Sequence, residues 1–512
     1  MELKFVLGTV AILLLIYLFH KYFIQVHKYW EKKGIPTFPG AIPFFGHTIE
    51  IFWNHRTFAC FIDKMYKANK GRSMIGFYQL QKPVLMIQDP ELMKSVLISD
   101  FPKFHENPFK VDKKMDPLLA ENPFFNTGEK WKTSRSRLSY ALMSGKRLRI
   151  LCHSIAHVCN KFTSYLRENV EKSKQGVYEV EMKELGNRFT GEVVANAAFG
   201  AEGDFFTNGS GPNSFREAVY GFLAPSLLNL IAQTILFLIP MLGSILKLRF
   251  VPKRMDQFFR RVIHEMISLR KKDGVERNDF LQLMLQGVKS EGGEIDENDI
   301  TASATSFFID GYETSAITMS FLVYRLAENP KVQEKLRDEI KRVLEKYNGE
   351  ICYESLKEMT FLDQAFNESM RLIPAVGFLT KQTTEQYKFL GKDGLECVLE
   401  PETQIILPLQ AIQNDPEYWE DPEVYKPERF NDDSEKNRPK TTFMPFSEGP
   451  RICPGMRFAT MQIKGAVVTI LKDYVVEVSP KTKRPLQPKR GAIITVMEGG
   501  LWINFKPIQS RT

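Results

Sequence analysis

Cysteine and histidine are scarce in this chain of 512 residues, which contains six Cys and eight His. Six cysteines are too few for a disulfide framework over this length, so we expect a reducing compartment. The signatures GxGxxG, HExxH and GxSxG are missing, and so is the P-loop. These absences exclude recognisable nucleotide sites and the common hydrolases, and any nicotinamide electrons must arrive from a partner protein.

Aromatic residues, by contrast, are abundant, with 39 Phe, 17 Tyr and 5 Trp. So much ring area implies a large apolar interior or an apolar cavity within it. The net charge of +8 is modest, and it suits an anionic surface or an acidic partner. Nucleic-acid binders usually concentrate more charge, so we expect no nucleic-acid partner.

The first 46 residues indicate an anchor and a hinge. Residues 5–19 carry no charge, and lysines are more numerous after this run than before it. Bulky and basic residues follow this run, where a cleavage site would have small residues, and this disfavours a cleaved export signal. We therefore predict an uncleaved membrane anchor at residues 1–23 with the remainder of the chain cytosolic. Residues 24–46 form a basic, proline-rich hinge, and residues 47–512 form the catalytic domain.

A second uncharged stretch covers Ala218–Leu246. Pro225, Pro240 and Gly243 interrupt it, and broken backbone hydrogen bonds are costly in lipid. We expect a surface that dips into the membrane interface or lines an apolar pocket rather than a spanning helix. A buried pair of helices is the alternative.

Helical patterns dominate the remainder, and the predicted fold class is mainly α with a minor β part. Residues 330–347 repeat apolar positions at helical spacing, and residues 299–326 predict a long helix through the core. A hairpin is expected from residues 74–80 and 84–88. Two further short runs, residues 404–407 and 492–497, are also expected to form strands.

The segment Phe446-Ser-Glu-Gly-Pro-Arg-Ile-Cys-Pro-Gly455 carries the strongest chemical signal. Its glycines, Gly455 among them, permit a tight loop that approaches a flat ligand closely. Cys453 precedes a helix, where backbone donors favour a thiolate and hence a metal ligand. Phe446 can shield the sulfur from water, and Arg451 offers a fork for a carboxylate. The other five cysteines are interpreted as inert.

Three further motifs accompany the Cys loop, and together they carry a resemblance. They are Trp131-Lys-Thr-Ser-Arg135, Glu368-Ser-Met-Arg371 and Pro427-Glu-Arg-Phe430. The chain resembles the cytochrome P-450 family of haem-thiolate monooxygenases over essentially its whole length. The resemblance implies that family's fold, with a long central helix crossing over haem b, and Cys453 as the ligand of its iron.

The resemblance also implies roles for the other motif residues. Trp131, Arg135 and Arg451 are expected to hold haem propionates. Glu368 and Arg371 lie one helical turn apart and can form a buried structural network with Arg429. Lys381 stands where the related pattern usually has Arg; it keeps the charge but loses the fork.

Asp310-Gly-Tyr-Glu-Thr314, inside the long predicted helix, resembles the family's oxygen-activation segment. There Glu313 and Thr314 are expected to handle protons, although a threonine hydroxyl can also bond back to its own helix. Asp310 replaces the family's usual Ala or Gly and shares a helix face with Thr314. Its carboxylate could favour cationic substrates, alter proton delivery, or pair with another residue.

The sequences of these motifs are similar to those of insect microsomal members of the family that oxidise foreign compounds. This similarity implies a monooxygenase on the endoplasmic reticulum membrane that inserts one oxygen atom of O₂ into lipophilic small molecules, such as plant toxins or insecticides. NADPH is used indirectly through a flavoprotein reductase, with cytochrome b5 as a second candidate donor and membrane lipids as neighbours. The reductase would meet a basic cluster at Lys130, Lys132, Arg137, Lys146, Arg147, Lys440 and Arg457, for which an ordinary solvated face is the alternative.

Three other functions remain open at this point. One is a dedicated hydroxylase of an endogenous hormone or lipid. Another is oxygen-independent rearrangement of peroxides on the same fold. The third is a non-enzymatic protein that binds haem or sequesters a ligand. The Glu313–Thr314 pair disfavours the last two.

Overall fold

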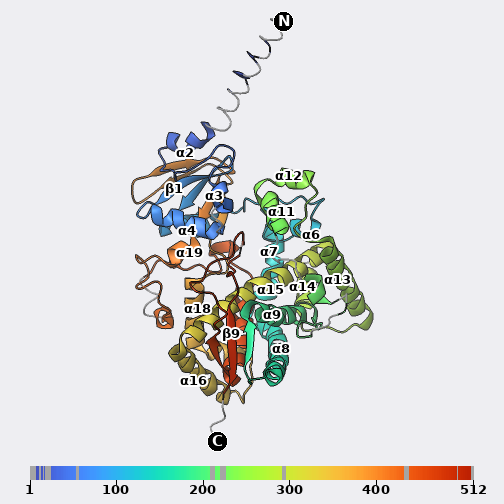
Figure 1. Cartoon of the computed structure of the whole chain (residues 1–512). Coiled ribbons are helices and arrows are strands. Elements are labelled where there is room, and N and C mark those ends of the chain that lie inside the picture. The colour runs from blue at the N-terminus through green and yellow to red at the C-terminus, as the bar shows by residue number, and fades with distance from the viewer. Residues whose placement is uncertain are drawn as a thin grey trace. The chain divides into compact units, whose positions relative to one another are not determined.

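The computed structural model describes residues 25–53, 57–207, 211, 214–219, 227–290, 296–431, 438–492 and 494–508, with a few positions before residue 25. The predicted anchor therefore lies almost wholly outside the described residues. The chain divides into two compact units (Figure 1). Unit 1 contains residues 1–108, 376–418 and 439–451, and unit 2 contains residues 109–375, 419–438 and 452–512.

A four-stranded mixed sheet forms the centre of unit 1, in the order β1-β2-β7-β4. Its strands are β1 (Met74–Gln79), β2 (Lys82–Ile87), β7 (Gln404–Leu407) and β4 (Leu379–Gln382). The β1–β2 pair is the expected antiparallel hairpin, and β7 lies where it was expected, parallel to β2. A second hairpin joins β5 (Tyr387–Leu390) to β6 (Glu396–Leu399).

Both faces of this sheet are buried. Leu85 and Ile87 point into one apolar cluster, whereas Val84 and Met86 point into another, as the alternation of a strand requires. The described helices of unit 1 are short: η2 (Gln25–Lys28), α2 (Tyr29–Lys32), α3 (Thr48–Trp53), α4 (Phe58–Ala68), α5 (Pro90–Lys94), η3 (Ser95–Ser99), η4 (Phe101–Lys103), α19 (Leu409–Gln413), η6 (Lys440–Thr442) and η7 (Gly449–Arg451).

Unit 2 is largely helical. The helices before its longest one are α6 (Pro117–Ala120), α7 (Gly128–Leu142), α8 (Gly145–Lys172), α9 (Met182–Phe199), α10 (Phe215–Val219), α11 (Leu227–Leu238), α12 (Pro240–Ile245), α13 (Lys253–Asp273) and α14 (Phe280–Ser290). The longest helix and those after it are α15 (Glu297–Glu328), α16 (Pro330–Lys346), α17 (Tyr353–Glu358), α18 (Thr360–Leu372), η5 (Pro427–Phe430) and α21 (Met456–Asp473).

Helix α15 is the predicted long helix, and it is buried along most of its 32 residues. Asp296 caps its first turn by accepting a hydrogen bond from Asn298 N at 2.8 Å. Small residues on its flank allow α9 to pack along it, and a Cβ at Gly186 of α9 would lie 2.9 Å from the Ala316 carbonyl oxygen. Helix α21 also packs on α15, so the element after the Cys loop is fixed against the oxygen-activation segment.

The β part of unit 2 is a three-stranded antiparallel sheet in the order β3-β9-β8. Its strands are β3 (Tyr178–Glu181), β9 (Trp502–Pro507) and β8 (Tyr474–Val478). The strand expected at residues 492–497 is wrong: in the described part of this segment only Met497 pairs, in an isolated bridge with Pro488. Gly499 and Gly500 both adopt positive φ, and the regular strand begins after them.

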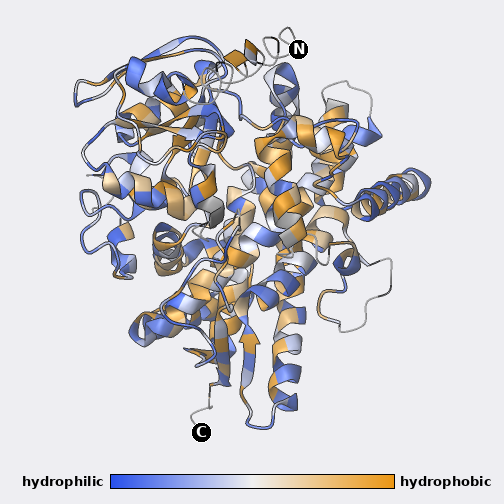
Figure 2. Cartoon of the chain, turned by 45° about the horizontal axis from the view of Figure 1, so that its top comes forward, coloured by the Kyte–Doolittle hydropathy of each residue, from blue (hydrophilic) through white to orange (hydrophobic). Residues whose placement is uncertain are grey.

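Of the stretch Ala218–Leu246, the structure describes residues 218–219, at the end of α10, and residues 227–246. The second of these ranges contains α11 and α12, and the chain breaks between them at Pro240, which cannot donate to the helix ladder. Hydrophobic residues predominate on these helices (orange in Figure 2). Among the residues that the structure describes, no helix combines the length and the apolar character needed to cross a bilayer.

Candidate functional site

Cys453 lies in unit 2, at the start of the turn that leads into α21. Its thiol is half-buried, and the backbone N–H groups of Gly455 and Met456 donate toward the sulfur. These donors favour the thiolate, as expected from the sequence, but burial outweighs them and raises the pKa of Cys453 to about 11. The Asp310 carboxylate adds to the same shift. A coordinating metal ion reverses this balance because it deprotonates a thiol outright.

The first half of the Cys loop belongs to unit 1. Gly449 adopts a φ of +74°, and a Cβ there would lie 1.9 Å from the Leu97 carbonyl oxygen, so only glycine fits. Arg451 Nε donates to the His105 carbonyl oxygen at 2.6 Å. Phe446 is half-buried in the same loop. On the other side of the loop, a Cβ at Gly455 would lie 4.0 Å from Cys453 Sγ.

Arg135, on α7 in unit 2, is a guanidinium without a partner. Among the described residues it forms no hydrogen bond and no ion pair, although burial lowers its pKa. Its charge acts on Cys453. Trp131, one helical turn earlier, is buried. A half-buried guanidinium that lacks an acceptor fits an anionic ligand such as a carboxylate.

Lys381 presents the same pattern within unit 1. It lies on β4 with 5% of its surface exposed, and its Nζ donates to Asn107 Oδ1 at 3.1 Å. Burial, and next the positive charge of Arg451, lower the pKa of Lys381 to about 7. No carboxylate pairs with it in the part of the chain that the structure describes. A buried lysine without an acidic partner in the described residues favours an anionic ligand.

On α15, Thr314 and Glu313 point to different partners. Thr314 Oγ1 donates to the Asp310 carbonyl oxygen at 2.5 Å, the back-bond to its own helix that was the alternative for this residue. Glu313 is buried, and its carboxylate lies 2.5 Å from Lys183 Nζ of α9. A Cβ at Gly311 would face Val194 of α9 at 3.4 Å. The proton-handling roles of Glu313 and Thr314 stay predictions.

Asp310 has surroundings of an unusual kind. Its side chain has exposed surface, yet the protein around it raises its pKa to about 7 through burial. Its hydrogen-bond partner is the amide of Asn122, which lowers the pKa of Asp310 by a smaller amount.

Glu368, Arg371 and Arg429 form one buried network in unit 2. Arg371 Nε donates to Glu368 Oε2 at 2.7 Å, and Arg429 Nε donates to Glu368 Oε1 at 3.0 Å. The remaining guanidinium hydrogens reach backbone oxygens, such as Arg371 Nη2 to Pro422 O at 2.6 Å and Arg429 Nη1 to Glu420 O at 2.7 Å. The network therefore holds residues 420–422, which precede η5, against α18.

Comparison with known proteins now identifies the family. A family model described as cytochrome P450 matches residues 36–503. The chain belongs to the cytochrome P450 family. It is 33% identical over 97% of both chains to cytochrome P450 6a2 of Drosophila melanogaster, and 31% identical over 94% of both to cytochrome P450 9e2 of Blattella germanica. The mainly helical fold with a small β part agrees with this family.

Membership makes the chain a haem-thiolate monooxygenase, and the residues of this P450 fit haem. Within unit 2, one soft thiol is available to iron, and Arg135 forms no ion pair among the described residues; within unit 1, Lys381 and Arg451 are basic side chains suited to carboxylates such as those of a porphyrin. The fit to haem rests on the Cys453 thiol and on these basic side chains, not on a group of several metal-ligating side chains. Within the described residues no group of three or more His, Cys, Asp or Glu could hold a metal ion by itself.

Several partners of the predicted residues in this P450 were missed by sequence reasoning. They are Asn122 beside Asp310, Asn107 beside Lys381, Lys183 beside Glu313, and Gln462, whose Nε2 donates to Ser315 Oγ at 2.7 Å. Asn107 and Asn122 stand in an otherwise Phe- and Pro-rich stretch, which was the available signal. The other two lie on ordinary amphipathic helices and gave none.

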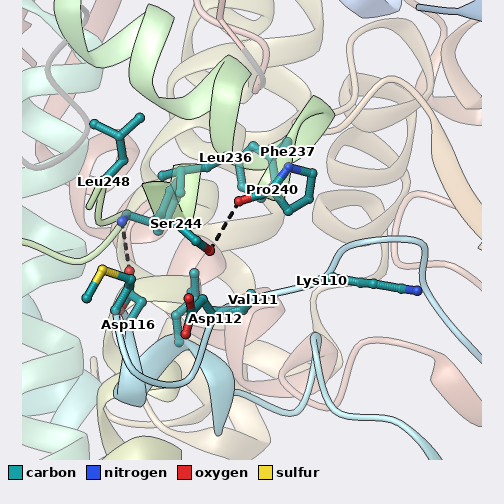
Figure 3. Close-up of a pocket in the computed structure, with 12 residues that line it drawn as sticks. Lys110, Val111, Asp112, Asp116, Leu236, Phe237, Pro240, Ser244 and Leu248 are labelled. Carbon is teal, nitrogen blue, oxygen red and sulfur yellow. Dashed lines mark hydrogen bonds between the residues drawn. The ribbon is translucent and has the colours of Figure 1, made fainter. Parts of the chain in front are cut away.

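A small pocket lies between α11–α12 and residues 110–119 of this P450 (Figure 3). Its volume of about 30 Å³ is far below the roughly 300 Å³ of a typical small-molecule site, so it is not the substrate site. Asp116 beside it accepts hydrogen bonds from Phe250 N at 2.7 Å and Val251 N at 2.8 Å. These hydrogen bonds link residues 110–119 to the segment after α12, and the pocket lies beside this link.

Proposed function

We propose that this P450 is a membrane-bound monooxygenase of lipophilic foreign compounds that takes electrons from NADPH through a flavoprotein reductase. The observation that carries the proposal is Cys453, a lone thiol at the head of α21, in a loop that keeps every fixed position of the family signature. When bound, haem supplies the iron at which O₂ is activated and one oxygen atom is transferred. The protein supplies the ligand, the orientation and the protons.

Cys453 is proposed as the iron ligand. Its thiolate is supported by the Gly455 and Met456 N–H groups. Arg135 in unit 2 and, separately, Arg451 and Lys381 in unit 1 are each proposed as a propionate-binding side chain. Phe446 would limit the access of water to the sulfur.

Thr314 is proposed to handle protons from α15. Its hydroxyl donates to the Asp310 carbonyl oxygen, which leaves its oxygen lone pairs available to accept from water or dioxygen-derived groups. Glu313 is proposed to feed protons from the side of Lys183, with which it pairs. That pair would have to exchange partners during turnover, since a buried carboxylate in an ion pair is not a proton donor.

A lipophilic substrate is supported by aromatic packing in unit 2. Phe109, Phe125 and Phe237 pack together: Phe125 stacks on Phe237, and Phe109 meets both rings edge to face, with centroids 5.2 Å apart for Phe109 and Phe237. Phe109 and Phe125 come from the segment before α7, and Phe237 lies on α11, in the stretch expected to dip into the membrane interface or line an apolar pocket. Dedicated oxidation of an endogenous hormone or lipid remains the second candidate, because the same apolar walls would serve it.

Membrane association on the endoplasmic reticulum is supported by the exposed apolar side chains of α11 and α12. Leu228 is 79% exposed, Met241 75% and Ile245 67%. Soluble surfaces rarely gather such residues on adjoining helices without a partner. Lys247, Arg249 and Lys253 follow directly and suit anionic headgroups.

The reduced carbon-monoxide difference spectrum tests the haem-thiolate assignment. We expect the long-wavelength Soret band of a thiolate-ligated haem in the purified full chain, and its loss in Cys453→Ser. Cys352→Ser, which changes a half-buried cysteine outside the Cys loop, is the matched control. A folded, haem-loaded wild-type protein without this band would refute the proposal. Product formation from a lipophilic test compound with NADPH and reductase, and none without reductase, would support the electron route.

A further inference from the structure

Asp310 introduces a negative charge beside the chemistry of α15, and the described protein does not neutralise it. No lysine, arginine or histidine forms an ion pair with its carboxylate in the described residues, and its hydrogen bond comes from the neutral amide of Asn122. Asp310 therefore does pair with another residue, as one of the expectations had it, but that residue is neutral and leaves the negative charge uncompensated. Buried carboxylates usually have a cationic partner or several donors.

The direction of the carboxylate is fixed by Asn122. Asn122 is buried, and its Oδ1 accepts from Phe124 N at 2.8 Å, which leaves the amide N–H₂ to face Asp310. One donor satisfies a carboxylate only in part, because its two oxygens can accept about four hydrogen bonds. The Asp310 side chain keeps exposed surface, so its remaining acceptor sites are open to a ligand.

Asp310 lies beside residues to which the reaction chemistry is assigned. Asp310 and Thr314 are four residues apart on α15 and share a helix face, and the Thr314 hydroxyl bonds to the Asp310 carbonyl oxygen. The charge of Asp310 also reaches Cys453. A ferric porphyrin with a thiolate ligand has no net charge at its centre, and its propionates are negative. The cofactor therefore offers Asp310 no counter-ion.

We propose that Asp310 is a specificity-determining residue that selects lipophilic substrates carrying a positive charge, with the ammonium group of the substrate as the missing partner of its carboxylate. This inference rests on the proposed function, since it names the substrate class of the same site. The rest of such a substrate is apolar, in keeping with the Phe-rich segments. The positively charged nitrogen would lie near Thr314 and Asn122.

Isosteric ligands test the charge alone. A 3-phenylpropyl-trimethylammonium ion and its carbon analogue, in which a tert-butyl group replaces trimethylammonium, have the same shape, and neither coordinates iron. Dissociation constants are measured on the holoenzyme by equilibrium dialysis, which does not depend on turnover. We expect Asp310→Asn to weaken binding of the ammonium ligand at least about tenfold, and that of the carbon analogue less than about threefold, because an enclosed carboxylate–ammonium pair is only partly screened.

Asp299→Asn is the matched control, because it removes the same charge from the same helix where Asp299 pairs with Arg137. It should leave the preference for the ammonium ligand unchanged. Equal weakening of both ligands by Asp310→Asn, or an equal loss of preference in Asp299→Asn, would overturn the inference. Asp310→Ala serves as a second variant if Asp310→Asn does not load haem.

Failure of this inference is distinguishable from failure of the proposed function. If the wild-type carbon-monoxide spectrum shows the thiolate band and the carbon analogue is oxidised with reductase, the monooxygenase stands. Absence of any preference for the ammonium ligand then overturns only the substrate class. A missing thiolate band overturns the proposed function itself.

Discussion

Glu368 shows most directly what a single residue contributes to this molecule. Its side chain is fully buried and accepts hydrogen bonds from both Arg371 and Arg429. Replacing it by glutamine keeps the shape but leaves two guanidinium groups without a counter-charge. We predict that Glu368→Gln costs about 3–5 kcal/mol of stability, because removing one partner leaves uncompensated buried charge. The measurements are the fraction of chain recovered with the thiolate band and its half-life at fixed temperature.

Glu428→Gln is the matched control for that prediction. Glu428 belongs to the same Pro-Glu-Arg-Phe segment but pairs with Lys335 on the surface, with both side chains about half exposed. An exposed pair contributes under about 1 kcal/mol, so this variant should retain haem as the wild type does. Equal haem loss in the two variants would contradict the special role of the buried network.

At the scale of elements, the exposed apolar residues of α11 and α12 predict a membrane-contacting surface. In a chain from which residues 1–23 have been removed, Met241→Ser together with Ile245→Ser should lower the fraction bound to phospholipid vesicles. The expected drop in binding is at least about tenfold, because each large apolar side chain withdrawn from water contributes about 1.5–3 kcal/mol. Vesicle sedimentation measures it.

Leu269→Ser provides the comparison for the membrane surface. Leu269 is 46% exposed on α13, outside the α11–α12 pair. It should leave vesicle binding unchanged. If all three substitutions lowered binding in proportion to the apolar area lost, the contact would be nonspecific and α11–α12 would not be a defined surface.

Elements with a local pattern could be predicted from the sequence. The β1–β2 hairpin, the long helix α15 and helix α16 follow from alternation or helical periodicity within one segment. The strand expected at residues 492–497 failed because its apolar residues precede two glycines with positive φ, and the pairing strand begins beyond them. Its partners are β8, which precedes it across the long connection 479–501, and β3, which lies far earlier in the chain, so local alternation could not place it.

The site residues likewise divide into those with a local sequence pattern, which could be predicted, and those that depend on long-range contacts, which could not. The Cys loop and Glu368–Arg371 are contiguous, so their chemistry was readable from spacing. Lys381 and Asn107 are 274 positions apart, and no property of either residue alone indicates the other. Glu313 was assigned to proton handling without its partner, because Lys183 is an ordinary residue of an amphipathic helix. A single sequence contains no information on such long-range pairs.

At the scale of the whole molecule, the basic cluster proposed to meet the reductase is partly neutralised. Lys130 pairs with Glu121, Lys132 with Glu129, and Arg137 with Asp299. Lys146 forms no ion pair within the described structure. Arg457 is exposed, and its guanidinium reaches only a carbonyl oxygen, that of Met143. The cations that remain available to steer an acidic partner are therefore fewer than the sequence suggests.

We predict that Lys146→Glu with Arg457→Glu raises the KM for reductase at least about tenfold at low salt, because like charges oppose the encounter with an acidic surface. Turnover supported by a peroxide needs no reductase and should stay within about twofold of wild type under the same conditions. Lys271→Glu with Lys357→Glu reverses the same number of charges elsewhere and should affect neither. The effect of the Lys146→Glu and Arg457→Glu pair on reductase-supported turnover should shrink as salt is added, because screening removes the electrostatic steering present in the wild type. A mutant that loses peroxide-supported turnover in parallel would instead indicate damage to the haem site, and the docking surface would have to lie elsewhere.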